Sequence, residues 1–242
     1  MIVAILISVH LLADFLFQTS TYSEKKRKIL KPLLLHCLIY FIVFEIVLLL
    51  ILQFKKAFLL GMIISVLHFL INFIKNKLEK SFPQRRLQIW IFSINQLIHF
   101  ALLIGMNYIF NLENSVSNLY IKLQEYENFK IIILYIFVFS IIFEPASVFI
   151  RKLFTSISPK TSPKENLEEL KAGNIIGKLE RIIIAILLLN NQFGVIGFVL
   201  TAKSIARFKQ MENRDFAEKY LIGTLTSFLI VLVTVLILKG LL

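Results

Sequence analysis

The chain has 242 residues, of which 57% are hydrophobic and 23 are Phe, and its mean hydropathy is +0.79. Stretches of about 20 nearly uncharged residues recur along it, which is typical of polytopic membrane proteins and excludes an ordinary soluble domain. The formal net charge is +12. The basic residues gather between the apolar stretches, so we expect them to contact anionic lipid headgroups and not nucleic acid.

The apolar stretches predict an all-α bundle of seven or eight hydrophobic segments in the lipid bilayer. The first stretch has neither a basic n-region nor a small-residue cleavage site, so we expect a retained span and not a removable signal peptide. A single cysteine, Cys37, excludes an internal disulfide. The predicted spans are 2–17, 32–54, 57–74, 87–110, 131–150 and 220–238, and a more complex apolar region covers 176–202.

The distribution of Lys and Arg predicts how these spans are oriented. Segments 19–31 and 75–86 each carry five basic residues, whereas 53–56 and 111–130 carry two each. The positive-inside rule therefore places the N-terminus outside and the first two basic segments in the cytoplasm.

The same pattern divides the chain into four parts. Residues 1–110 are expected to form a histidine-bearing transmembrane domain, and 111–150 an external loop and the fifth span. Residues 151–175 contain Ser-Pro twice and mixed charge, which is typical of a cytoplasmic linker. Residues 176–242 are expected to form a helical hairpin, an amphipathic helix and the last span.

All four histidines, His10, His36, His68 and His99, lie inside predicted spans. An unpaired imidazole in hydrocarbon costs a few kcal/mol, so histidines in several spans are expected to meet one another. At a helical rise of about 1.5 Å per residue, the first three reach the same depth in the cytoplasmic leaflet, and His99 lies deeper.

Polar residues one helical turn away extend this set. Asp14 follows His10 by four residues and Asn72 follows His68 by four, so each pair projects from one helix face. Imidazole and carboxylate suit a divalent metal or a proton relay, whereas plain interhelical hydrogen bonds contribute about 0.6 kcal/mol each. Candidate catalytic residues are His10, Asp14, His36 and His68; candidate metal ligands are these and His99; supporting polar residues are Gln18, Asn72, Asn95, Gln96 and Glu144.

Four short motifs resemble those of a bacterial inner-membrane family whose function is unknown: HLLADFLFQ at 10–18, LH at 35–36, HFLIN at 68–72 and NQLIH at 95–99. The resemblance implies a bacterial inner-membrane location. Some members lie beside a soluble protein called SatD, which implies a cytoplasmic partner.

More remotely, the scatter of His and Asp on helix faces is similar to that of membrane-bound metal-dependent hydrolases, which implies a bound divalent metal. Relatives are often acidic at the positions of Asn72 and Asn95. This chain therefore offers fewer anionic ligands than that pattern, which weakens the metal interpretation.

The apolar region 176–202 has Asn190, Asn191 and Gln192 near its centre, where a helix interior tolerates them poorly. We therefore expect a hairpin that turns at 190–194. With the hairpin, 22 of the 27 basic residues lie on the cytoplasmic side, against 18 with a single span.

That hairpin would bring Glu180 to the depth of Lys203 and Arg207 as an ion pair at the membrane surface. An exposed pair of this kind contributes less than about 1 kcal/mol. Alternatively, Arg181, Lys203 and Arg207 form a cradle for a phosphate group, which Arg binds well.

Three functions stay open at this point. The one we place first is a membrane scaffold or sensor that docks a cytoplasmic protein. The second is a metal-dependent hydrolase of a lipid or phosphate ester, in which the histidines and Asp14 act as ligands and bases. The third is an ion- or proton-coupled transporter, which also needs polar access from the outer side. Only Glu45 lies there, and its spacing from His36 predicts that it faces away from the histidines.

Overall fold

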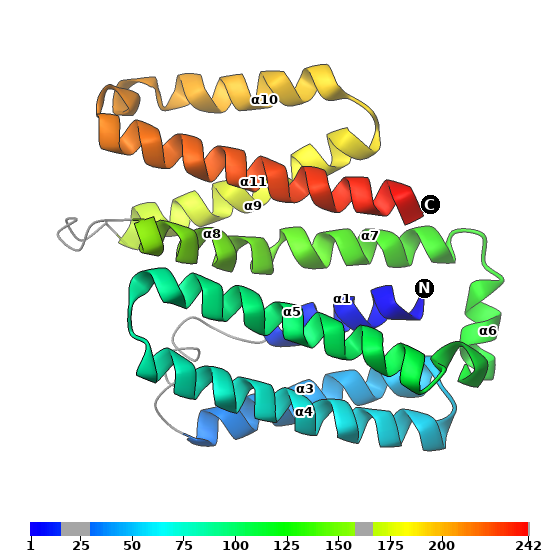
Figure 1. Ribbon diagram of the computed structural model, residues 1–242. Coiled ribbons are helices and arrows are strands. Elements are labelled where there is room, and N and C mark those ends of the chain that lie inside the picture. Colours follow the sequence, from blue (N-terminus) through cyan, green and yellow to red (C-terminus); the bar gives the residue numbers. More distant parts are fainter. Residues whose placement is uncertain (16–29, 158–166, 242) are drawn as a thin grey trace. The chain divides into compact units, whose positions relative to one another are not determined.

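The computed structural model describes residues 1–15, 30–157 and 167–241, and these fold into helices joined by short turns (Figure 1). Five helical segments are long and apolar enough to cross a membrane among the described residues. The predicted all-α membrane class is therefore confirmed. The five segments are Lys31–Ile51, Phe54–Ser81, Arg85–Ile109, Phe129–Ile157 and Arg214–Gly240, and shorter apolar helices cover Ile2–Phe15 and Phe193–Ala206.

The chain divides into two compact units, unit 1 (Met1–Ser140) and unit 2 (Ile141–Leu242). This division differs from the predicted first domain, which ended at residue 110. The helices in chain order are α1 (Ile2–Phe15), α3 (Leu30–Ile51), α4 (Phe54–Ser81), α5 (Arg85–Ile109), η1 (Leu112–Ser115), α6 (Asn118–Gln124), α7 (Phe129–Ile142), α8 (Glu144–Ile157), α9 (Leu167–Leu189), α10 (Phe193–Ala206), η2 (Phe208–Glu212) and α11 (Arg214–Leu241).

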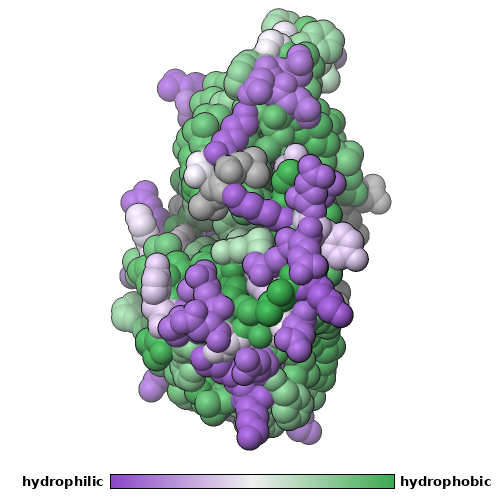
Figure 2. Space-filling view, turned by 90° about the vertical axis from the view of Figure 1, so that its right-hand side faces the viewer, coloured by the Kyte–Doolittle hydropathy of each residue, from purple (hydrophilic) through white to green (hydrophobic). Residues whose placement is uncertain are grey.

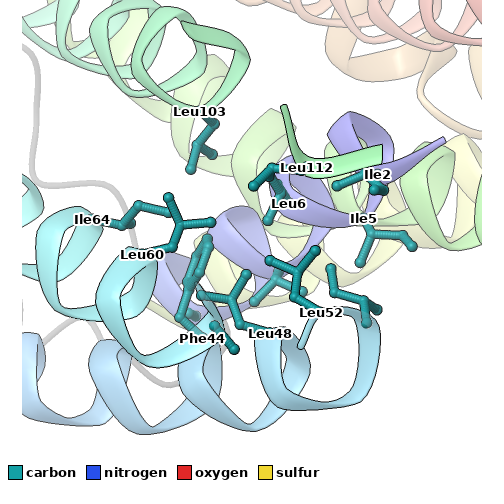
Figure 3. Close-up of a cluster of buried hydrophobic side chains, with 14 of the residues drawn as sticks. Ile2, Ile5, Leu6, Phe44, Leu48, Leu52, Leu60, Ile64, Leu103 and Leu112 are labelled. Carbon is teal, nitrogen blue, oxygen red and sulfur yellow. The ribbon is translucent and has the colours of Figure 1, made fainter. Parts of the chain in front are cut away.

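In unit 1, α3 packs against α4, α4 against α5, and α1 against both α3 and α5. Buried apolar side chains from these four helices form one cluster, together with Leu52, Leu112 of η1 and Tyr120 of α6 (Figure 3). Phe44, Leu60 and Ile64 in this cluster are fully buried. Between helices in lipid, such side chains stabilise the packing mainly by close van der Waals contact.

The segment after α5 holds the turn between α3 and α4. Leu52 forms an isolated antiparallel bridge with Val116. The backbone N–H of Gln53 donates to Ser115 O at 3.0 Å, and Lys56 Nζ donates to Ser115 Oγ at 2.5 Å. Figure 2 looks onto this end of unit 1, where hydrophilic residues gather while the flanks are hydrophobic. This is the pattern of a bundle whose helix ends meet water and whose sides meet lipid.

In unit 2, α11 packs against α8 and α9, and α9 against α10. The predicted fifth span is broken after α7, at Phe143, because Pro145 lacks the N–H that would continue the helix. The chain turns at Asn190–Gln192, between α9 and α10, with Asn191 in the left-handed region at a φ of 57°. Asn is one of the few side chains that tolerate this conformation.

Two segments of this region have a secondary structure that the sequence did not predict. The linker at 151–175 is helical where it is described, because α8 continues to Ile157 and α9 begins at Leu167; the remainder lies outside the described residues. The predicted amphipathic helix after residue 203 is interrupted twice, and α11 begins at Arg214. Asn213 stops the helix because its Oδ1 accepts a hydrogen bond from Phe216 N at 3.1 Å and caps α11.

Candidate metal site

Three potential metal ligands meet inside unit 1, each from a different helix. Asp14 comes from α1, His36 from α3 and His68 from α4, and one ligand atom from each lies within 4.8 Å of the others. His36 Nε2 lies 3.1 Å from Asp14 Oδ1 and 3.1 Å from His68 Nε2. The side chains are 8%, 2% and 1% exposed. Helix packing, and not a flexible loop, therefore sets the separation of these atoms.

Two of the three separations suit a single small cation, and the third, between Asp14 and His68, is at most 4.8 Å. Ligand atoms about 2.0–2.1 Å from one tetrahedral zinc ion are about 3.3 Å apart. The two contacts of His36 Nε2 are close to this value. Two imidazoles and one carboxylate also match the ligand types of three-ligand zinc sites.

A series of hydrogen bonds begins at Oδ2 of Asp14, the carboxylate oxygen that does not contact His36. Gln96 Nε2 donates to Asp14 Oδ2 at 3.2 Å, which leaves the Gln96 amide oxygen facing His10. His10 Nε2 must then donate to Gln96 Oε1, at 3.2 Å. His10 Nδ1 accepts from Tyr40 OH at 3.1 Å. This series fixes the tautomer of His10 and orients Asp14, so His10 is a supporting residue here and lies outside the three-ligand set.

Asn72 fixes the state of His68 in a similar way. Its Nδ2 donates to the backbone oxygen of His68 at 3.1 Å and lies 3.0 Å from His68 Nε2. Because an amide nitrogen can only donate, His68 Nε2 is an acceptor and its proton is on Nδ1. The lone pair of Nε2 is the one that a metal would use.

His99 lies beside the three ligands although the sequence predicted a deeper position. Its ring stacks on that of His10 with 4.7 Å between centroids, and it is 4.8 Å from the ring of His68. The depth estimate was wrong because α4 and α5 are antiparallel neighbours, with positions 68 and 99 almost equally far from the turn that joins them.

Several buried polar atoms around this cluster have no hydrogen-bond partner among the described residues. His99 Nδ1 donates to Asn95 O at 2.7 Å, but His99 Nε2, His68 Nδ1 and the amide of Asn95 lack such a partner. Each such group costs about 1–3 kcal/mol. A cluster that carries this cost in apolar surroundings is a candidate for function.

One predicted site residue, Glu144, belongs to unit 2, where it pairs with Lys178. Another, Gln18, lies outside the described residues.

Sequence reasoning missed one member of the cluster, Tyr40, which is 1% exposed. Its ring lies flat on that of His68, with 3.6 Å between centroids and 9° between planes. The signal was present, because Tyr40 follows His36 by one helical turn.

The charged residues of the C-terminal region form ion pairs within unit 2. Lys203 Nζ donates to Glu180 Oε2 at 2.5 Å and to Thr224 Oγ1 at 3.1 Å. Arg207 donates to Gln210 Oε1 at 2.8 Å. This arrangement corresponds to the ion-pair interpretation, with Glu180 pairing with Lys203.

Arg181 contacts the break between α7 and α8. Its Nε donates to Ile142 O at 2.6 Å, and its Nη2 donates to Phe143 O at 3.2 Å and to Ser147 Oγ at 2.5 Å. Nη1 lies 3.5 Å from Ser227 Oγ. The guanidinium therefore donates to backbone oxygens that have no helical partner at the break. Its N–H groups contact other residues of the protein, so they are not free to bind a phosphate group.

Comparison with known families shows which family the chain belongs to. Residues 2–129, more than half of the chain, match the family described as "Protein of unknown function (DUF3307)", so the chain belongs to that family. The matched region includes α1, α3, α4 and α5, which supply every residue of the histidine cluster. No curated protein and no solved structure matches the chain.

Proposed function

We propose that unit 1 is a membrane-embedded metal-binding module that holds one divalent ion of the zinc class. The observation that carries this proposal is the meeting of Asp14, His36 and His68, with ligand atoms within 4.8 Å of one another. Imidazole nitrogen favours zinc, cobalt or nickel over magnesium and calcium, which prefer all-oxygen sites. Binding requires that the proton leaves His36 Nε2 and that Asn72 Nδ2 moves away from the lone pair of His68 Nε2.

The activity we propose first is hydrolysis of a lipid or phosphate ester. Catalytic zinc sites use three protein ligands and keep a fourth position for water or substrate, whereas structural sites are closed by four. His99 Nδ1 donates to Asn95 O, which leaves the lone pair on His99 Nε2 without a hydrogen-bond partner among the described residues. The ring of His99 is 4.8 Å from that of His68, so a base stands beside the ligands.

A metal-responsive sensor or scaffold is the second candidate. It is favoured by the burial of the cluster, since neither the three ligands nor His10 or His99 exceeds 8% exposure. A permanently bound ion would then fix the helix packing of unit 1. The basic segments would dock a cytoplasmic protein such as a SatD-like partner.

The test of metal binding is elemental analysis of the full chain purified in detergent. We expect one zinc-class ion per chain in the unaltered protein and in His99→Gln, which changes a buried histidine outside the ligand set. We expect the ion to be lost in Asp14→Asn, His36→Ala and His68→Ala, with folding monitored by elution as a monodisperse species. Equal metal content in all five proteins contradicts the assignment.

Hydrolysis is separated from sensing with two fluorogenic probes, 4-methylumbelliferyl decanoate and bis(4-methylumbelliferyl) phosphate, in mixed micelles. A hydrolase turns over at least one of them in the metal-loaded form and not in Asp14→Asn. Stoichiometric metal without turnover of either probe overturns the hydrolase and supports the sensor.

We also propose that the protein lies in a bacterial inner membrane, with the N-terminus outside and seven or eight hydrophobic segments. The test is labelling of single cysteines in a Cys37→Ser background by a reagent that does not cross membranes. Glu125→Cys and Asn191→Cys should react from the periplasm, and Gln84→Cys and Glu212→Cys should not. Labelling of Glu212→Cys from outside makes 182–202 a single span.

A further inference from the structure

A carboxyl group lies in the α3–α4 interface, in the half of unit 1 that is otherwise apolar. Glu45 Oε2 occupies the place where a Cβ on Gly61 would lie, and its Cδ is 3.1 Å from that place. On the other side, Leu48 Cδ1 is 3.5 Å from it. Gly61 therefore gives α4 a notch into which the carboxyl fits. The sequence predicted only that Glu45 faces away from the histidines; the close contact with Gly61 had no signal in the sequence.

Both oxygens of Glu45 are buried and have no hydrogen-bond partner among the described residues. Among the described residues, none of the ion pairs involves Glu45. An ionised, unpaired carboxylate in such surroundings costs far more than a neutral group. The seated group is therefore stable when it holds a proton.

We infer that Glu45 and Gly61 form a proton-binding site in the α3–α4 interface. The proton is bound by the carboxylate when the group is seated in the notch and is released when it leaves the notch. This site is separate from the metal ligands and does not depend on metal binding. It is relevant to them because α3 also supplies His36 and α4 also supplies His68.

A row of polar groups leads from this notch toward the histidines. Gly61, Ser65 and His68 are spaced by four and three residues, so they lie on one face of α4. Ser65 Oγ and His68 Nδ1 are also buried without a partner among the described residues. The distance from Gly61 to His68 along the helix is about 10 Å. A transporter would need such a row, whereas a hydrolase would not.

Two experiments test whether Glu45 is protonated in the α3–α4 interface. One uses Glu45→Gln, and the other uses dicyclohexylcarbodiimide, an apolar reagent that modifies protonated carboxyl groups in membranes. Gln resembles the protonated acid, so we expect an unchanged Tm for Glu45→Gln and modification of Glu45 in the unaltered protein, read by peptide mass spectrometry. A clear fall in Tm would mean that an ionised carboxylate is needed. Protection from the reagent by Na⁺ would mean that a metal cation occupies the notch. Either result overturns the proposal.

The notch is tested by a double-mutant cycle. Gly61→Ala should lower the Tm in the unaltered background, because its Cβ displaces the carboxyl, and should be tolerated when Glu45→Ala is also present. Gly105→Ala is the matched control, since a Cβ there meets nothing within 4 Å. If Gly61→Ala lowers the Tm equally in both backgrounds, the notch does not serve Glu45. Metal content is measured in parallel, so failure of the metal site is recognised separately.

Discussion

The two units each bury a polar cluster among apolar helices, but only one of the clusters satisfies its own hydrogen bonds. In unit 2, Arg181 donates to two backbone carbonyls and a hydroxyl, and Lys203 pairs with Glu180. No buried side-chain nitrogen or oxygen of the described part of unit 2 lacks a partner. In unit 1, His68, Asn95 and His99 each keep a buried atom without a described partner.

This difference separates a structural role from a functional one. A fully paired polar cluster fixes a helix arrangement and leaves no atoms over for a ligand. A cluster with ligand atoms about 3 Å apart offers a place for an ion, and the neighbouring polar atoms without a described partner are available to a second ligand such as a substrate. Stability should therefore depend most on the cluster of unit 2, and metal binding on that of unit 1.

The largest stability effect is expected for Arg181→Met. It leaves the backbone oxygens of Ile142 and Phe143 without their donor at the helix break, which should cost about 1–3 kcal/mol for each oxygen. Thermal or denaturant unfolding in detergent measures this. Arg214→Met is the control, because Arg214 is 90% exposed and pairs only with Glu218. If both changes lower the stability equally, Arg181 does not have the structural role that we assign to it.

The largest effect on metal binding is expected for the ligands. Asp14→Asn and His68→Ala should each weaken binding at least about 100-fold, because three-ligand sites tolerate no loss of a ligand. They should lower Tm far less than Arg181→Met. Competition with a fluorescent zinc chelator measures the affinity. If each change weakens binding less than a few-fold, these atoms do not hold the ion.

A smaller effect on metal affinity is expected for Gln96, which does not bind the metal itself but forms a hydrogen bond to the ligand Asp14. Gln96→Leu removes the hydrogen bond to Asp14 Oδ2 and separates His10 from the carboxylate, so affinity should fall about 10–100-fold. Gln88→Leu, on the same helix and bonded to Glu79 O and Phe82 O, should leave the affinity unchanged. If Gln88→Leu weakens binding as much as Gln96→Leu, the effect comes from α5 and not from the hydrogen-bond chain.

The smallest effect is expected within the ion pair of unit 2. Glu180→Gln and Lys203→Met, combined in a double-mutant cycle, should show a coupling energy above about 0.5 kcal/mol, because Glu180 is only 7% exposed. Both single variants should keep the metal affinity of the unaltered protein. Strict additivity of their unfolding free energies would mean that the pair does not stabilise the hairpin.

The sequence predicts the membrane class and the polar residues of the cluster, but not which of these residues contact one another. The apolar stretches predict the membrane class, and the four-residue spacing places Asp14 on the same helix face as His10. Periodicity says nothing about which side chains pair across helices. It therefore could not tell that Asp14 joins His36 and His68 while His10 bonds to Gln96.

Other features depend on tertiary contacts that have no local signal. The antiparallel packing of α4 and α5 sets the depth of His99, and the notch at Gly61 sets the direction of Glu45. The role of Arg181 requires knowledge of where α7 breaks. Pro145 marked that break in the sequence, yet the donor that stabilises it lies more than 30 residues further along the chain.

X-ray absorption of the zinc-loaded full chain tests the central claim most directly, because it counts the ligands of the bound ion. The account predicts two imidazole nitrogens and a carboxylate oxygen at about 2.0–2.1 Å, with loss of one imidazole contribution in His36→Ala. A shell of oxygen atoms alone, or a shell unchanged in His36→Ala, would contradict the assignment of Asp14, His36 and His68 as the metal site.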